Sequence, residues 1–313
     1  MTTLERLRNP SREHRFVTGD GAALHVEWSG PAAAPVTLVL VHGWTQDHRT
    51  WDGVVRHLGP ATRVVRYDLR GHGGSSPARR GAATIPRLAD DLAELIAERV
   101  PNGPVVLAGH SMGGMTIMAL AERHPALVKA RVAGVAFVAT SSGQMDRITL
   151  GLPGLAGSMS ARFERRLAKA LAHRKGERLP LSPAMVRSGA RFLVFGDKPK
   201  RDDVNSVVDQ LLCAHPASLG EFQDAISVHD CRVALRALRT VPAVVLAGEK
   251  DRLCPLPHAE VIAGELPDAE FVRYPGAGHM LPQERAAEVA ARIKSLLSAV
   301  SVRTLAPKGT SRP

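Results

Sequence analysis

The chain has 313 residues and a formal charge of +11 at pH 7, and 44% of its residues are hydrophobic and 23% charged. This length and balance exclude both a minimal domain and a disordered polymer, and they predict one large core that carries an inserted subdomain. The three cysteines, Cys213, Cys231 and Cys254, lack C-x-x-C spacing, which argues against a disulfide framework and against a zinc site built on cysteines.

The excess of positive charge raises the question of nucleic acid or an anionic membrane as a partner. Basic residues are spread along the chain, with one dense run at 161–178, and aromatic residues make up only 4%, so base stacking has no support. We expect a solvated helix face at this run and no nucleic-acid partner. Weak contact with an anionic surface, or attraction of an acidic substrate, is the alternative.

Residues 1–16 contain charges throughout and no apolar stretch long enough for a signal peptide or a membrane span. We therefore expect a cytoplasmic protein without stable membrane insertion. The sequence does not determine the oligomeric state.

Short apolar runs rich in β-branched residues alternate with segments of helical periodicity. This alternation is typical of an α/β fold with a mostly parallel, doubly wound sheet covered by helices on both faces. The expected strands, in chain order, are 23–28, 36–41, 63–68, 105–109, 132–139, 243–248 and 270–274. The expected helices are 86–100, 112–123, 258–265 and 284–297.

The most informative stretch is 104–121, PVVLAGHSMGGMTIMALA, in which an apolar run ends in Gly-His-Ser-Met-Gly-Gly and passes directly into a helix. This is G-x-S-x-G between a strand and a helix. A serine on so sharp a turn has a strained backbone, and Gly109 and Gly113 give the turn the space it needs. We expect Ser111 to be an exposed nucleophile, with the Met112 backbone N–H free to bind a developing oxyanion.

A second oxyanion donor is expected after the strand at 36–41, which runs into His42-Gly43-Trp44. Because Gly43 lacks a side chain, the chain can turn there and direct the Trp44 N–H toward the same point as that of Met112. We expect His42 to brace this turn and to have no catalytic role.

The combination of VHGW, DLRGHGGSS at 68–76 and GHSMGG resembles the α/β-hydrolase superfamily over roughly residues 20–300. It is most similar to the branch with esterases, perhydrolase- or haloperoxidase-like hydrolases and carbon–carbon bond hydrolases. The resemblance implies that the loop at 68–73 is structural, so that Asp68 and His72 belong to the scaffold.

A serine hydroxyl needs a histidine to accept its proton. His279 lies in the Gly-rich loop PGAGHM, between the last expected strand and the last expected helix, and the resemblance places the base at this position. His258, His110 and His72 are the other candidates.

A carboxylate must hold that histidine in the correct tautomer. Asp251 follows the strand expected at 243–248, and it lies between serine and histidine in the chain order of the family that the sequence resembles. Glu249 and Asp146 are the alternatives.

Residues 1–140 and 240–300 are expected to form the α/β-hydrolase core, residues 141–239 a helical cap or lid, and residues 301–313 a mobile tail. Apolar residues of the cap predict a pocket for an apolar acyl group or ring, although each of them is also suited to packing the cap on the core. These residues are Leu150, Leu152, Leu155, Met159, Phe192, Leu193 and Phe195.

These patterns predict a serine hydrolase that cleaves an ester, thioester or lactone of a small, largely apolar substrate through an acyl-enzyme, without a metal or other cofactor. A carbon–carbon bond hydrolase or a cofactor-free perhydrolase would use the same triad, and a non-hydrolytic isomerase, cyclase or ligand receptor could share the scaffold. Haloalkane dehalogenases and epoxide hydrolases use an aspartate nucleophile, so Ser111 argues against both.

Overall fold

The central feature of the computed structural model, which describes residues 14–145, 166, 168–174, 176, 179 and 181–305, is an eight-stranded sheet. The strand order is β1-β2-β4-β3-β5-β6-β7-β8. The strands are β1 (Arg15–Val17), β2 (Ala23–Ser29), β3 (Thr37–Val41), β4 (Arg63–Tyr67), β5 (Val105–His110), β6 (Val132–Val138), β7 (Ala243–Gly248) and β8 (Glu270–Tyr274).

β2 runs antiparallel to both of its neighbours, β1 and β4, and β3 to β8 are parallel to one another. The register is set by buried pairs such as Val39 against Val65 on one side and Leu107 on the other. β3, β5 and β7 are buried at every position, as expected of strands covered on both faces. The carboxyl ends of the parallel strands therefore meet at one edge, where open α/β sheets place their ligands.

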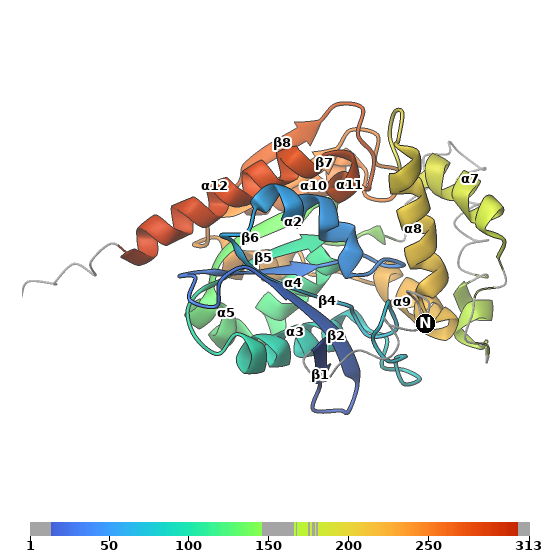
Figure 1. Cartoon of the computed structure of the whole chain (residues 1–313), viewed down its shortest axis with the longest axis horizontal. Helices are drawn as coiled ribbons and strands as arrows, with labels where there is room; N and C mark the ends of the chain where they lie inside the picture. Colours follow the sequence, from blue (N-terminus) through green and yellow to red (C-terminus); the bar gives the residue numbers. More distant parts are fainter. Residues whose placement is uncertain are drawn as a thin grey trace, which may run out of the picture.

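Helices cover both faces of the sheet (Figure 1). One face packs against α2 (Asp52–Leu58) and α12 (Ala286–Leu305), in a core that includes Trp51 and Ile293. The other packs against α3 (Ile85–Arg99), α4 (Met112–Arg123), α5 (Pro125–Arg131) and α10 (Leu256–Glu265). The prediction of a doubly wound α/β sheet is confirmed.

Between β6 and β7, in the segment expected to form a cap, the described residues form helices. They are α7 (Pro183–Leu193), α8 (Arg201–Cys213), α9 (Pro216–Ser227) and the 3-10 helix η4 (Val233–Leu238). α7, α8 and α9 lie together at one end of the sheet, on the right of Figure 1. Hydrogen bonds from the Asp47 N–H to Gln210 and from the Trp44 indole to the Leu219 carbonyl tie α8 and α9 to the loop after β3.

The structure adds elements that the periodicity did not predict. β1 pairs only with β2, and its three residues are too few for an alternating pattern to be visible in the sequence. The loop after β3 contains the 3-10 helix η2 (His48–Trp51), and α11 (Leu281–Glu284) precedes α12. α12 continues through Leu305, into the segment expected to be a tail, and Val300 is buried in the core.

In the part of the chain that the structure describes, no helix has the length and apolar character that crossing a bilayer requires.

Candidate active site

Ser111 occupies the sharp turn between β5 and α4. Its backbone has φ 53° and ψ −121°, a conformation that residues other than glycine rarely adopt. A Cβ on Gly109 would lie 2.5 Å from the Gly113 carbonyl, and a Cβ on Gly113 would overlap the Val41 carbonyl. The two glycines therefore allow β5, the turn and α4 to approach closely, and Ser111 stays partly exposed while its neighbours are buried.

Hydrogen bonds from the neighbouring strand β6 hold this strained turn. The Ser111 N–H donates to the Val138 carbonyl at 3.0 Å, and the Thr140 hydroxyl donates to the Ser111 carbonyl at 2.6 Å. Sequence reasoning missed Thr140. Its position just beyond β6, at the same sheet edge as Ser111, was a signal that could have identified it.

Asp251 and His279 form a buried pair. His279 Nδ1 lies 2.8 Å from Asp251 Oδ2, and the other carboxylate oxygen accepts the N–H groups of Leu253 and Cys254, both at 2.8 Å. A carboxylate held by these two backbone donors presents its free oxygen to the ring, so Nδ1 carries the proton and Nε2 is left as a base. The pair combines the acid and the base predicted from the sequence.

The loop that carries His279 is held by a backbone carbonyl from the segment between α7 and α8 and by a partly buried carboxylate. The Val194 carbonyl accepts the N–H groups of His279 at 2.9 Å and Met280 at 3.1 Å. Glu284 accepts the N–H groups of Gly278 at 3.0 Å and Gly196 at 2.9 Å, and burial raises the pKa of this carboxyl. No sequence motif indicated Glu284, because its role depends on a contact with a segment far away in the chain.

His110 brings the serine turn and the histidine loop together. Its Nε2 lies 2.9 Å from the His279 carbonyl oxygen, and the two rings are 4.9 Å apart. Burial lowers the pKa of His110 well below its usual value, so the ring is neutral and donates to this carbonyl. Within the described part of the chain, no hydrogen bond joins Ser111 Oγ to His279.

The two expected oxyanion donors lie beside this turn. A Cβ on Gly43 would come within 3.0 Å of the Ser111 Cβ, so the loop after β3 passes directly over the serine. Neither the Met112 nor the Trp44 backbone N–H donates to another described residue. Both groups therefore have their hydrogen-bonding capacity free.

The other candidate histidines have structural partners. His42 contacts the Gly43 carbonyl and accepts the Leu69 N–H, both at 2.8 Å, so it braces the turn as expected. His72 accepts the Thr45 N–H at 3.2 Å, and burial lowers its pKa to about 3. His258 contacts the Ser141 hydroxyl at 2.7 Å.

Of the alternative acids, Glu249 is exposed beyond β7. Asp146 lies outside the residues that the structure describes.

The expected pocket residues are only partly placed. Phe195 is buried against Val204, Val207 and Met280, where it packs α8 against the loop that carries His279. Phe192 is 55% exposed and lies under the Arg252 guanidinium. Leu193 is partly buried. Leu150, Leu152, Leu155 and Met159, and half of the basic run at 161–178, lie outside the described residues.

Comparison with known proteins supports the fold. Residues 36–286 match the family model of the alpha/beta hydrolase fold. The chain is 31% identical to a pimeloyl-[acyl-carrier protein] methyl ester esterase from Aromatoleum aromaticum, over 77% of this chain and 90% of that protein. A protein of the same name from Nitrosomonas europaea is 27% identical over 82% of this chain and 93% of its own length.

Among solved structures, a thermophilic esterase from Thermogutta terrifontis superposes with a TM-score of 0.73 at 25% identity, covering 92% of this chain and 97% of the esterase. The family-model match covers most of the chain, and the strand order, the serine turn and the Asp251–His279 pair are consistent with it. The chain therefore belongs to the alpha/beta hydrolase fold family.

Proposed function

We propose that the protein is a serine esterase that cleaves a small, largely apolar ester through an acyl-enzyme at Ser111. The observation that carries this proposal is the strained turn that exposes Ser111, joined through His110 to the loop of a buried Asp251–His279 pair. The esterases among its relatives support the same reaction.

In the proposed mechanism, His279 Nε2 takes the proton of Ser111 Oγ as the oxygen attacks the ester carbonyl. The free N–H groups of Met112 and Trp44 bind the oxyanion, and each such donor typically contributes about 10²–10³ in rate. Asp251 stabilises the imidazolium that forms. His279 then protonates the leaving alcohol, and water activated by the same ring cleaves the acyl-enzyme.

The relatives guide the proposed substrate class. Two relatives are named for a methyl ester of an acyl group on a carrier protein, so we include methyl esters of acyl chains among the proposed substrates. An anionic end or carrier on an otherwise apolar acyl group is compatible with the positive charge of the chain.

The test is turnover of p-nitrophenyl esters of increasing chain length, beside methyl esters, thioesters and lactones, by the wild type and by Ser111→Ala. We expect Ser111→Ala to lose about 10³-fold or more in kcat, because the nucleophile is removed while the fold is kept. Ser188→Ala, at an exposed position in α7, is the matched control and should keep wild-type rates. Near wild-type turnover by Ser111→Ala would refute the proposal.

Further assays separate the alternatives that share the triad. Cleavage of a dienoic ketoacid would indicate a carbon–carbon bond hydrolase, and acetate-dependent peroxidation a perhydrolase. A fluorophosphonate probe should label Ser111 in any of these enzymes. A receptor, isomerase or cyclase without an activated serine should fail to react.

A further inference from the structure

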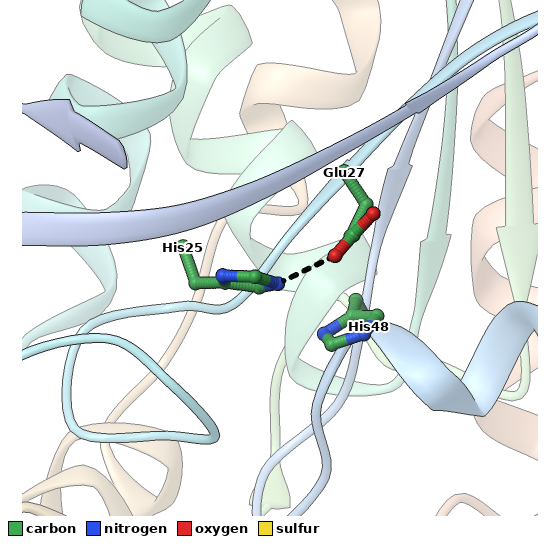
Figure 2. A group of neighbouring side chains, drawn as sticks. All are labelled: His25, Glu27 and His48. Atoms are coloured by element: carbon green, nitrogen blue, oxygen red, sulfur yellow. Dashed lines mark hydrogen bonds and ion pairs between the residues drawn. The ribbon is translucent and has the colours of Figure 1, made fainter. Parts of the chain in front are cut away.

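A second group of polar side chains converges near the antiparallel edge of the sheet. His25 and Glu27 are two residues apart on β2 and so face the same side, and His48 opens η2. One nitrogen or oxygen atom from each of the three lies within 4.8 Å of the other two. Figure 2 shows the three side chains turned toward one another, with His25 Nε2 3.0 Å from Glu27 Oε1.

The His48 ring is oriented by a carboxylate behind it. Its Nδ1 donates to Asp68 Oδ1 at 2.7 Å, and Asp68 is itself fixed by the N–H groups of His48 and Gly74, both at 2.7 Å. In the neutral ring, Nε2 is then the unprotonated nitrogen, and no hydrogen bond to a described residue engages it. The Asp68 carboxylate outweighs burial and raises the pKa of His48, so an ion at Nε2 competes with a proton. Metal-binding histidines are commonly oriented by such a carboxylate.

The charges around the group favour a cation. Glu27 and the fully buried Asp68 are ion-paired only with histidines among the described residues. The neighbouring guanidinium, that of Arg66 opposite Glu27 in β4, is directed to Asp52. When the histidines are neutral, neither the Glu27 nor the Asp68 carboxylate therefore has a positively charged ion-pair partner among the described residues.

The ring of His25 adds an independent observation. It is 4% exposed, and its Nδ1 is buried with no partner in the described part of the chain. Its contact with the half-buried Glu27 is thus the one side-chain hydrogen bond described for this ring, and Glu27 also lies 3.7 Å from His14 Nδ1, so a bound ion would replace these two contacts.

We propose that His25, Glu27 and His48 bind a divalent transition-metal ion, with Zn²⁺ as the expected occupant and Asp68 orienting His48. Two imidazole nitrogens and one carboxylate oxygen suit zinc and its neighbours, whereas Mg²⁺ and Ca²⁺ prefer oxygen ligands. Ligand atoms around zinc lie about 3.4 Å apart, so small side-chain rotations close the group around the ion. Water completes the coordination on the side of the partly exposed Glu27.

A neighbouring group, Asp47, His48 and Asp68, has similar spacing but is less suited to an ion. The Asp47 carboxylate accepts three hydrogen bonds from the Arg49 guanidinium and one from the Arg49 backbone N–H. The Asp68 carboxylate accepts three hydrogen bonds, from the His48 N–H, the His48 ring and the Gly74 N–H. The proposed ion instead connects β2 to η2, at the end of the loop that carries Trp44. Binding should therefore stabilise the fold.

The experiment is calorimetric titration of the tag-free, EDTA-treated full chain with Zn²⁺ and with Mg²⁺, together with the absorption spectrum after Co²⁺ addition. We expect one equivalent of Zn²⁺ to bind, a rise of Tm with Zn²⁺ concentration, and no response to Mg²⁺. Glu27→Gln should weaken Zn²⁺ binding about tenfold or more, since it removes a charged ligand while keeping the side-chain shape.

Two control variants test where the ion binds. His124→Gln removes a histidine that pairs with a single carboxylate, Asp90, and should leave the affinity unchanged. His279→Gln tests whether zinc binds at the triad instead, and it too should bind as the wild type does. Circular dichroism verifies that each variant is folded. Equal affinity of the wild type and Glu27→Gln, or no Zn²⁺ binding by the wild type, would overturn the proposal.

Discussion

At the scale of single residues, the site depends on groups that fix backbone as much as on those expected to react. His279 is held at its ring by Asp251, at its N–H by the Val194 carbonyl and at its own carbonyl by His110. Each contact restricts a different part of the residue, so the ring has little freedom to turn. We attribute the precision of the acid–base pair to this set of contacts.

Asp251→Asn tests the pair directly. The amide keeps an oxygen for the Leu253 and Cys254 N–H groups but presents an N–H to His279 Nδ1, which favours the wrong tautomer of the ring. We expect kcat on an activated ester to fall by about 10⁴-fold with little change in Tm. A loss of less than about tenfold in kcat would show that another acid serves the histidine.

At the scale of elements, close approach of β3, β5 and α4 determines the geometry around Ser111. Gly113 lies in the first turn of α4 against the end of β3, and a Cβ there would overlap the Val41 carbonyl. Since backbone on both sides has to move to relieve this overlap, the turn cannot adapt as a flexible side chain would.

Gly113→Ala should therefore lower both stability and activity, with a loss of roughly 1–3 kcal/mol in the free energy of unfolding. Gly189→Ala is the matched control, because Gly189 is an exposed residue inside α7 with open space around its Cβ position. That change should raise stability by about 0.5–1 kcal/mol through helix propensity alone. Chemical denaturation of the two variants is the measurement, and equal effects would contradict the steric argument.

At the scale of the whole molecule, several histidines are buried in the neutral form, and this couples folding to pH. Burial lowers the pKa of His72 to about 3 and that of His229 to about 4, whereas an unfolded chain has a histidine pKa of about 6.5. Below pH 6.5 the unfolded state binds protons that the folded state does not. Stability should therefore fall as the pH drops through this window.

His229→Gln isolates one of these groups. The stability of the wild type relative to this variant should decrease between pH 7 and pH 4 by up to ~3 kcal/mol, because the variant has no proton to bind at this position. Urea denaturation at a series of pH values measures the difference, with the exposed His57→Gln as the control. Parallel profiles for the wild type and His229→Gln would contradict the prediction.

Local sequence patterns determined the strands, the main helices and the serine turn, because these depend on periodicity and on glycine at fixed spacing. β3 to β8 lie where apolar runs predicted them, and α4 has the bounds expected of it. Chain order and resemblance then proposed Asp251 and His279, whose side chains the structure brings to 2.8 Å. The contact between Ser111 and His279 stays a prediction.

Only the tertiary structure decided which distant segments support these residues. Glu284, the Val194 carbonyl and Thr140 carry no motif, since each contacts a backbone group far away in the chain, Glu284 through the Gly196 N–H. The group of His25, Glu27 and His48 likewise exists only because β2 and η2 fold together. Spacing along a chain reports local geometry, whereas contacts between segments depend on how the whole sheet and its helices pack.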